Sequence, residues 1–257
     1  MKIEILVSTM KRENIDFLSN MNIKSDVIIG NQSDKFSTEE FVFNGNKCKF
    51  ITTNTKGLSR NRNITLDNAT GDICLIADDD LTYEDDYVEK IINAFNENPS
   101  ADLIIFNLKE KPIIRYLIKK KFKVKYLNYM RFGSVRIAFK LNSIREKGIK
   151  FDNNFGSGSI VPFGEDTIFL HDCLKAKLKI YAIPEYLLSL NNDRPSTWFN
   201  GYTEEYLINK GKLFRRINKK YLFLLCFQDA FRHHKKYGYS FFKTLSLERL
   251  GGKNETD

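Results

Sequence analysis

Short apolar segments alternate with helix-compatible segments over the first 108 residues, and this alternation constrains the fold more than any other feature of the chain. The apolar segments of strand length are 3–9, 27–30, 49–53, 73–77 and 103–108. Two intervening segments have helical character: 59–69, which we expect Gly71 to terminate, and 87–95, which ends before Pro99. This pattern is typical of an α/β protein with a Rossmann-like mixed, mostly parallel sheet flanked by helices.

Three consecutive aspartates follow the fourth predicted strand. Asp78, Asp79 and Asp80 come directly after the apolar run 73–77, where a buried strand reaches the surface. Carboxylates this close repel one another, and a divalent cation with oxygen ligands often offsets that repulsion together with a phosphate. The triplet therefore predicts a metal and a phosphorylated ligand. The alternative is a solvated acidic turn that also caps a helix beginning near 83–86.

Polar residues also follow the first two predicted strands. Ser8 and Thr9 close the first strand, and Asn31 follows the second. In an open, mostly parallel sheet, the ligand lies beyond the carboxyl ends of the strands. We therefore expect these residues and the aspartate triplet to meet at one edge.

The second half of the chain contains a Gly-rich loop and an acidic pair. Residues 155–159 read Phe-Gly-Ser-Gly-Ser, and Gly164, Glu165 and Asp166 follow. Apolar residues at helical spacing continue over 168–174, which places both acids at the start of a helix, where the amino end favours an ionised carboxylate. A further strand is expected at 135–139.

Charge is unevenly distributed along the chain. Residues 109–150 carry a net charge of +12 and residues 201–257 one of +6, whereas the whole chain carries +9, so the remainder is acidic. Basic segments beside an acidic body indicate an anionic partner contacted on one side. We do not expect nucleic acid, because neither segment contains a recognisable recognition motif. The apolar block 221–227 either packs on the domain or lies in a membrane interface.

Residues 56–80 resemble the inverting family 2 glycosyltransferases of GT-A fold, of the kind that build bacterial surface polysaccharides. That family reads G-x-S-x-x-R-N, then an alanine and a glycine, then a strand ending in D-x-D. The residues that match in order and spacing are Gly57, Ser59, Arg62, Asn63, Ala69, Gly71, Asp78 and Asp80. Downstream, Phe155 and Gly156 are similar to the family's acceptor-side loop, and 164–166 to its E-D motif.

The resemblance covers about residues 1–195 and predicts the domain organisation. Residues 1–200 would form the GT-A domain, with a nucleotide-sugar-binding half at 1–108 and an acceptor-side half at 109–200. Residues 201–257 would add a basic helical C-terminal extension.

By the same resemblance, the donor is a nucleotide sugar gripped through its diphosphate by Mn²⁺ or Mg²⁺. Asp80 is the expected metal ligand. Asp78 is expected to contact the ribose or the metal, and Asp79 belongs to the same donor site. Hard oxygen ligands suit such a cation, which neutralises charge on the departing nucleoside diphosphate.

Other donor contacts are expected around the triplet. Ser8 and Thr9 would line the nucleoside pocket, and Arg62 would reach the base or a phosphate. Gly57 is also expected among the donor-binding residues. The alternative for Arg62 is a solvated charge on a helix.

The chain departs from the family in two places. Its second strand ends in Gly30, Asn31 and Gln32, where the family usually has an acid that reads the base. An amide at Asn31 or Gln32 could still pair with uracil or thymine, because it offers both a donor and an acceptor. A family histidine is also missing from 188–198, where Arg194 is expected to contact the diphosphate instead.

Asp166 is the expected general base, again by resemblance. It would take the proton from an acceptor hydroxyl as that hydroxyl attacks the anomeric carbon and inverts its configuration. Glu165 is the neighbouring candidate. The alternative is that both acids only cap a helix.

Two other functions are open at this point. The sequence of 78–82 also satisfies the D-x-D-x-T pattern of haloacid dehalogenase-like phosphatases, in which the first aspartate, here Asp78, is the nucleophile and the second, here Asp80, an acid. Against this, the nucleophile there follows the first strand of its domain, whereas Asp78 follows the fourth predicted strand. The other alternative is a non-catalytic binding module of the same fold.

Cellular location is inferred from the cysteines and the amino-terminal segment. Four scattered cysteines without zinc-ligand spacing indicate a reducing compartment, and polar residues interrupt the amino-terminal apolar run too early for a signal peptide. We expect a cytoplasmic protein, peripheral on the inner face of an anionic membrane, with a glycan or a lipid-diphosphate-linked sugar as its acceptor.

Overall fold

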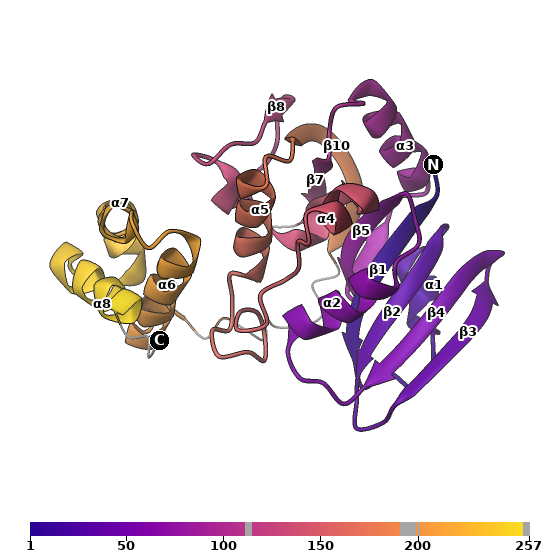
Figure 1. Cartoon of the computed structure of the whole chain (residues 1–257), viewed down its shortest axis with the longest axis horizontal. Coiled ribbons are helices and arrows are strands. Elements are labelled where there is room, and N and C mark those ends of the chain that lie inside the picture. The colour runs from indigo at the N-terminus through magenta and orange to yellow at the C-terminus, as the bar shows by residue number, and fades with distance from the viewer. Residues whose placement is uncertain (111–114, 191–198, 200, 254–257) are drawn as a thin grey trace.

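One mixed sheet forms the centre of the molecule (Figure 1). The computed structural model describes residues 1–110, 115–190, 199 and 201–253. The described strands are β1 (Ile3–Met10), β2 (Asp26–Gln32), β3 (Ser37–Phe43), β4 (Asn46–Thr53), β5 (Ile73–Asp78), β6 (Leu81–Tyr83), β7 (Leu103–Lys109), β8 (Phe122–Lys123), β9 (Ile137–Lys140) and β10 (Ile180–Leu190).

Their order across the sheet is β3-β4-β2-β1-β5-β9-β7-β10-β6, and β8 pairs with β10. Six of the described strands run in one direction, namely β1, β2, β4, β5, β7 and β10. The predicted α/β architecture with a mixed, mostly parallel sheet is confirmed.

Helices cover both faces of the sheet. The described helices are α1 (Phe17–Met21), α2 (Leu58–Asn68), α3 (Tyr87–Glu97), α4 (Leu141–Glu146), α5 (Glu165–Lys175), α6 (Glu204–Ile217), α7 (Leu222–Tyr237) and α8 (Phe241–Lys253). Side chains of α1 and α3 enter one hydrophobic core, and side chains of α2, α4 and α5 enter the other. Alternation along β1 supplies both cores, because Ile5 and Val7 face the first and Leu6 faces the second.

The hairpin of β3 and β4 was not predicted. Only the second of its strands, at 49–53, was expected, and β3 pairs with it antiparallel at the edge of the sheet. Asn44 and Gly45 form the turn with φ angles of 49° and 81°, which is the Asn-Gly geometry that favours a two-residue hairpin.

The prediction that Gly71 terminates a helix is wrong. Helix α2 ends at Asn68, and its C-cap is the extended residue Ala69. A Cβ at Gly71 would lie 2.7 Å from the Cβ of Glu4, so glycine is needed there for close approach to β1. The Glu4 carboxylate accepts hydrogen bonds from the backbone N–H groups of Thr70 (2.6 Å) and Gly71 (3.0 Å).

Strand β9 joins the two halves of the chain in one sheet. The strand predicted at 135–139 begins at Ile137, after a 3₁₀ turn at Ser134–Arg136. It runs antiparallel between β5 and β7, so strands from both halves of the chain belong to the sheet whose edge carries the aspartates.

The three C-terminal helices pack against α5 and the loop before it. Leu213 and Phe214 of α6 share a hydrophobic cluster with Phe155 and Ile168. Figure 1 shows α6, α7 and α8 gathered on the α5 side of the molecule, far from β3. Among the described helices, none combines the length and apolar character required to cross a bilayer.

Arg216 adds ion pairs between α6 and the body of the protein. It contacts Asp152 at 2.6 Å and Asp172 at 2.8 Å. The apolar block 221–227 is divided: Cys226 is buried in the cluster with Leu213 and Phe214, whereas Phe223 and Leu224 are exposed.

Candidate active site

The predicted polar residues meet at the carboxyl edge of the parallel strands. Ser8 of β1 lies between Gly30 of β2 and Asp78 of β5 in the strand register, and Thr9 lies beside Asn31. The Oγ of Ser8 is buried without a hydrogen-bond partner among the described residues. The three aspartates do not cap the next helix, since β6 intervenes and α3 starts only at Tyr87.

Asp79 is held by groups from the end of β1. Its Oδ2 accepts hydrogen bonds from Thr9 Oγ1 (2.7 Å) and from Arg12 Nε (3.0 Å), and Arg12 Nη2 lies at 2.5 Å. The Arg12 guanidinium also lies over the ring of Phe17, 5.0 Å from its centroid. The negative charge of Asp79 is therefore compensated within the protein.

Arg12 was not predicted from the sequence. The amide of Asn31 holds it in place: Asn31 Oδ1 accepts from Arg12 N (3.0 Å), and Asn31 Nδ2 donates to Arg12 O (2.9 Å). The same Nδ2 also donates to Thr52 Oγ1 (3.2 Å). The chain turns between β1 and Arg12 through Lys11, whose φ is 54°, and no sequence motif marks this local geometry. Base recognition by Asn31 stays a prediction.

Arg62 connects the aspartate triplet to the acidic pair. It is 2% exposed, and its Nη2 donates to Asp78 Oδ1 while its Nη1 donates to Glu165 Oε1, both at 3.0 Å. Burial alone would lower the pKa of Arg62, but the carboxylates of Asp78 and Glu165 more than offset it, and the pKa is raised. The alternative of a solvated helix charge is wrong for this residue.

The remaining residues of the G-x-S-x-x-R-N motif fix α2 to the segment 151–159. Ser59 Oγ donates to Phe155 O (2.6 Å), and the amide of Asn63 bonds both backbone groups of Phe151 (2.8 and 2.9 Å). Gly57 lies against the Gly-rich loop, where its Cβ would be 3.0 Å from Ser159 Oγ. The motif thus joins the two halves, and donor contact by Gly57 stays a prediction.

Glu165 and Asp166 occupy the first turn of α5 and differ in their partners. Glu165 is 8% exposed and paired with Arg62, and burial followed by repulsion from Asp166 raises its pKa. Asp166 is partly exposed, and its Oδ1 accepts from Thr167 N at 2.7 Å. Burial of its carboxylate also raises the pKa of Asp166, with Arg62 opposing the shift. The Oδ2 atom of Asp166 lies 3.5 Å from the Cβ position of Gly133.

Asp80 differs from the two aspartates before it. Asp78 is paired with Arg62 and Asp79 with Arg12, whereas no Lys or Arg of the described residues forms a salt bridge with Asp80. Burial raises the pKa of Asp80 to about 6, and repulsion from Asp78 and Asp79 adds to the shift. Asp80 is thus the one aspartate of the triplet without an ion pair to a described residue.

A cavity lies at the carboxyl end of β7, next to Tyr186 of β10. Its volume is about 300 Å³, and it is lined by Asn107, Leu108, Lys109, Glu110, Arg115, Tyr116, Leu117, Arg136 and Tyr186. Arg115 forms an ion pair with Glu110, and its charge opposes the rise in the pKa of Asp80. The cavity is therefore within electrostatic reach of the aspartate edge.

Three further residues complete the comparison with the sequence predictions. Gln32 ends β2 and is partly exposed. Arg194 lies outside the described residues. His171 of α5 is a packed helix residue, since it is buried with its Nδ1 3.2 Å from the hydroxyl of Tyr129.

Comparisons with known proteins identify the fold and the family. Solved structures of S. aureus TarS share the fold. The complex of TarS 1–349 with UDP-GlcNAc aligns with a TM-score of 0.67 at 15% identity, covering 96% of this chain and 76% of that one. The complex with UDP aligns with a TM-score of 0.63 at 14% identity, and the alignment covers 99% of this chain and 92% of the TarS chain. A longer TarS structure gives a TM-score of 0.62 at 14% identity, and the alignment covers 91% of this chain and 44% of the TarS chain.

The search of curated protein sequences returned no match. The profile of glycosyl transferase family 2, by contrast, matches residues 22–155, which is more than half of the chain and includes α2, the aspartate triplet and the start of the Gly-rich loop. The phosphatase alternative is thereby removed. The chain belongs to glycosyl transferase family 2.

Proposed function

We propose that this glycosyltransferase moves a sugar from a UDP-sugar to a hydroxyl of a glycan or lipid-diphosphate-linked acceptor, with inversion at the anomeric carbon and with the help of Mn²⁺ or Mg²⁺. One observation carries the proposal: Arg62 bonds Asp78 at the donor edge and Glu165 at the start of α5. A single buried cation thus fixes the donor-side and acceptor-side acids relative to one another.

The donor set at the aspartate edge fits a hard divalent cation. No three His, Cys, Asp or Glu side chains of the described residues are grouped to hold a metal ion alone. Mg²⁺ sites of nucleotide enzymes commonly need only one or two carboxylates, because substrate phosphates and water supply the other ligands. Asp80 would be the principal ligand, with Asp78 beside it. The bound cation would neutralise the charge that develops on the leaving diphosphate.

The nucleoside would lie at the ends of β1 and β2. The buried Oγ of Ser8 has no hydrogen-bond partner among the described residues, so a ligand group could satisfy it there. Thr9 and Gln32 end the same two strands. TarS 1–349 was solved with UDP and with UDP-GlcNAc, which favours a uridine nucleotide for this chain as well.

Asp166 would act as the general base. The hydroxyl oxygen of the acceptor forms a bond to the anomeric carbon while the bond from that carbon to the diphosphate oxygen breaks. The hydroxyl proton passes to Asp166, and the electron pair leaves with the diphosphate. Glu165 is occupied by Arg62, which makes it a positioning residue, whereas the Oδ2 of Asp166 faces the loop at Gly133.

The cavity at the carboxyl end of β7, whose lining residue Arg115 acts electrostatically on Asp80, offers a place for the sugar or the acceptor. Asn107, Tyr116 and Tyr186 contribute polar and aromatic groups to its wall. Such mixed walls suit carbohydrates, whose faces are apolar and whose edges carry hydroxyl groups.

A binding and product assay tests the proposal. We expect UDP to raise the melting temperature in the presence of Mn²⁺ and to lose most of this effect in EDTA, because a ligand that binds only the native state stabilises it by mass action. NMR of the product formed from a UDP-sugar should show an inverted anomeric configuration. Absence of binding by every nucleoside diphosphate would contradict the proposal, and binding without turnover would favour the non-catalytic module.

A further inference from the structure

An exposed row of aromatic side chains runs along α7. Phe223, Phe227 and Phe231 follow one another at four-residue spacing, with 56%, 42% and 69% of their surfaces exposed. Their neighbouring ring centroids lie 6.1 and 6.5 Å apart. Leu224 is exposed beside them, at 57%. A contiguous apolar patch of this kind is rare on a soluble surface and marks an interaction site.

The row continues onto α8. The ring of Phe227 lies 5.4 Å from Phe241, which lies 5.2 Å from Phe242, and Phe242 is 79% exposed. The guanidinium of Arg249 lies over Phe223, 5.4 Å from the ring centroid. We call this surface, made of Phe223, Leu224, Phe227, Phe231, Phe242 and Arg249, the aromatic face.

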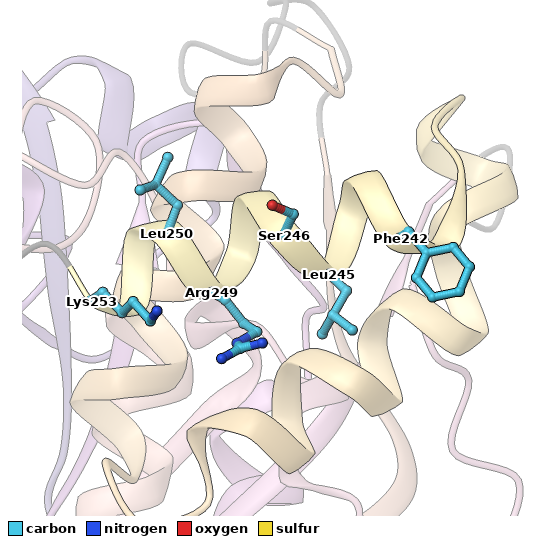
Figure 2. Close-up of a pocket in the computed structure, with 6 residues that line it drawn as sticks. All are labelled: Phe242, Leu245, Ser246, Arg249, Leu250 and Lys253. Atoms are coloured by element: carbon cyan, nitrogen blue, oxygen red, sulfur yellow. The ribbon is translucent and has the colours of Figure 1, made fainter.

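An open hollow of about 370 Å³ lies on α8. Figure 2 labels the residues that line it, among them Phe242, Arg249, Leu250 and Lys253. Leu245 and Arg249 point to the same side of the helix, as their four-residue spacing requires. Apolar and cationic side chains thus alternate around this part of the aromatic face.

In residues 219–253 the basic side chains are exposed, whereas the acidic ones are buried. Every Lys and Arg in this range is exposed: Lys219, Lys220, Arg232, Lys235, Lys236, Lys243, Arg249 and Lys253. The two acids, Asp229 and Glu248, are buried. Asp229 accepts from Tyr237 (2.8 Å) and pairs with Lys210 (2.8 Å), so its charge is compensated inside the bundle. The outer surface of α7 and α8 is therefore purely basic where it is charged.

We propose that the aromatic face docks on an anionic lipid bilayer, with α7 and α8 lying in the plane of the interface. A bilayer presents anionic headgroups above an apolar layer, which matches exposed phenylalanines surrounded by Lys and Arg. A folded acidic protein offers the charge without a deep apolar layer, and nucleic acid recognition does not require four exposed aliphatic and aromatic groups on neighbouring helix turns. Interfacial docking needs no membrane-spanning helix.

The location of this surface links docking to the active site. Leu213 of α6 would contact a Cβ at Gly164 at 2.9 Å, so α6 packs directly on the amino end of α5 that carries Glu165 and Asp166. Helices α6, α7 and α8 would hold the amino end of α5 at a fixed orientation to the bilayer. This link alone rests on the proposed function, in which the acceptor is lipid-linked.

The basic segment 109–150 is a less suitable docking surface. Several of its charges are used within the fold: Arg136 is buried, and Arg115, Lys109 and Lys150 pair with Glu110, Glu84 and Asp67. Its exposed lysines, 119–121 among them, serve as the comparison in the test.

Vesicle co-sedimentation of the full chain tests the proposal. We expect the wild type to sediment with phosphatidylglycerol-containing vesicles at low salt, to bind less in high salt, and to stay in solution with pure phosphatidylcholine. The double variant Phe227→Ser/Phe231→Ser should bind at least about tenfold more weakly. Phe36→Ser, which replaces a phenylalanine that is 70% exposed before β3, is the matched control and should bind like the wild type.

Charge-reversal variants show which basic residues contribute to vesicle binding. Lys235→Glu/Lys236→Glu should weaken binding to anionic vesicles, whereas Lys119→Glu/Lys120→Glu should have the smaller effect. The proposal is overturned if the wild type does not sediment with anionic vesicles, or if the phenylalanine double variant binds as well as the wild type. It is also overturned if light scattering shows a dimer that this double variant dissolves. No donor or acceptor is present in the assay, so its failure is separate from failure of the proposed transfer reaction.

Discussion

The carboxyl edge of the sheet and the aromatic face of α7 and α8 differ in whether their charged side chains are paired within the protein. At the edge, cations and anions are paired inside the protein: Arg12 with Asp79, and Arg62 with both Asp78 and Glu165. On α7 and α8, the acids are buried and the bases are left exposed. The first arrangement fixes side chains for chemistry. The second leaves charge available to a large external partner.

Asp80 is the exception at this edge, and the proposed function gives it the cation. Its two neighbours form ion pairs with arginines, whereas no Lys or Arg of the described residues forms an ion pair with Asp80. An edge with every acid paired would have no place for a cation. The comparison therefore predicts that Asp79, which is paired with Arg12, supports structure and that Asp80 is the principal ligand of the cation.

The largest expected effect is that of Asp166→Asn. The substitution keeps the shape of the side chain and removes the proton acceptor, so the rate of transfer should fall about a thousandfold while UDP binding stays unchanged. Steady-state kinetics and calorimetry of UDP binding measure the two quantities. Transfer at the wild-type rate would exclude Asp166 as the base.

Replacement of the buried bridge should affect folding. Arg62→Ala leaves Asp78 and Glu165 without their shared cation, and breaking a buried pair from one side costs about 3 kcal/mol of unfolding free energy. Arg60→Ala, on the exposed side of the same helix, is the matched control and should change stability by less than about 0.5 kcal/mol. Urea denaturation of both variants checks the difference, and equal stability would show that the bridge is not important for the fold.

Asp80→Asn should stabilise the ligand-free protein, whereas Arg62→Ala should destabilise it. The pKa of Asp80 is about 6 in the fold against an ordinary value of 3.8, so its ionised form is disfavoured in the native state. The resulting destabilisation is absent below pH 3.8, grows up to about pH 6 and is constant above it. After allowance for solvent screening, the variant should be more stable than the wild type by about 1 kcal/mol at neutral pH.

Thermal melts of this variant across pH measure that effect. The gain should disappear towards the acid end of the range. A loss of stability at neutral pH would mean that the charge of Asp80 is compensated in the native protein.

The smallest effect is expected on α7. Lys235→Glu changes an exposed charge, so the free energy of unfolding should change by less than about 0.5 kcal/mol. Calorimetry of the free protein measures this change, and vesicle binding measures the separate effect on docking. A large loss of stability would mean that the exposed bases are part of the fold and would remove the contrast between the two regions.

Much of the fold could be predicted because hydrophobic periodicity determines it. The buried runs at 3–9 and 73–77 extend by one residue as β1 and β5, and the helix at 59–69 is α2 with shifted ends. Edge strand β3 was missed because it is largely exposed, with Phe41 and Phe43 only partly buried, although the Asn44-Gly45 pair marks its turn.

Predictions at the site depended on sequence motifs. A motif identifies candidate residues, but it does not show which other side chains they contact in the fold. Asp78 and Glu165 are 87 positions apart in sequence, and their connection through Arg62 follows from how α2 crosses between the sheet and α5. Arg12 belongs to no motif and reaches Asp79 only because Asn31 shapes the turn after β1. Such tertiary contacts depend on packing that no local pattern encodes.

Calorimetric titration of UDP in the presence of Mn²⁺, with Asp80→Asn and Asp79→Asn side by side, shows whether Asp80 holds the cation. We expect Asp80→Asn to abolish the metal-dependent part of UDP binding. Asp79→Asn replaces a carboxylate that already forms an ion pair with Arg12, and it should retain metal-dependent binding within a few fold. Metal-dependent binding that survives Asp80→Asn and is lost in Asp79→Asn would exclude Asp80 as the principal metal ligand.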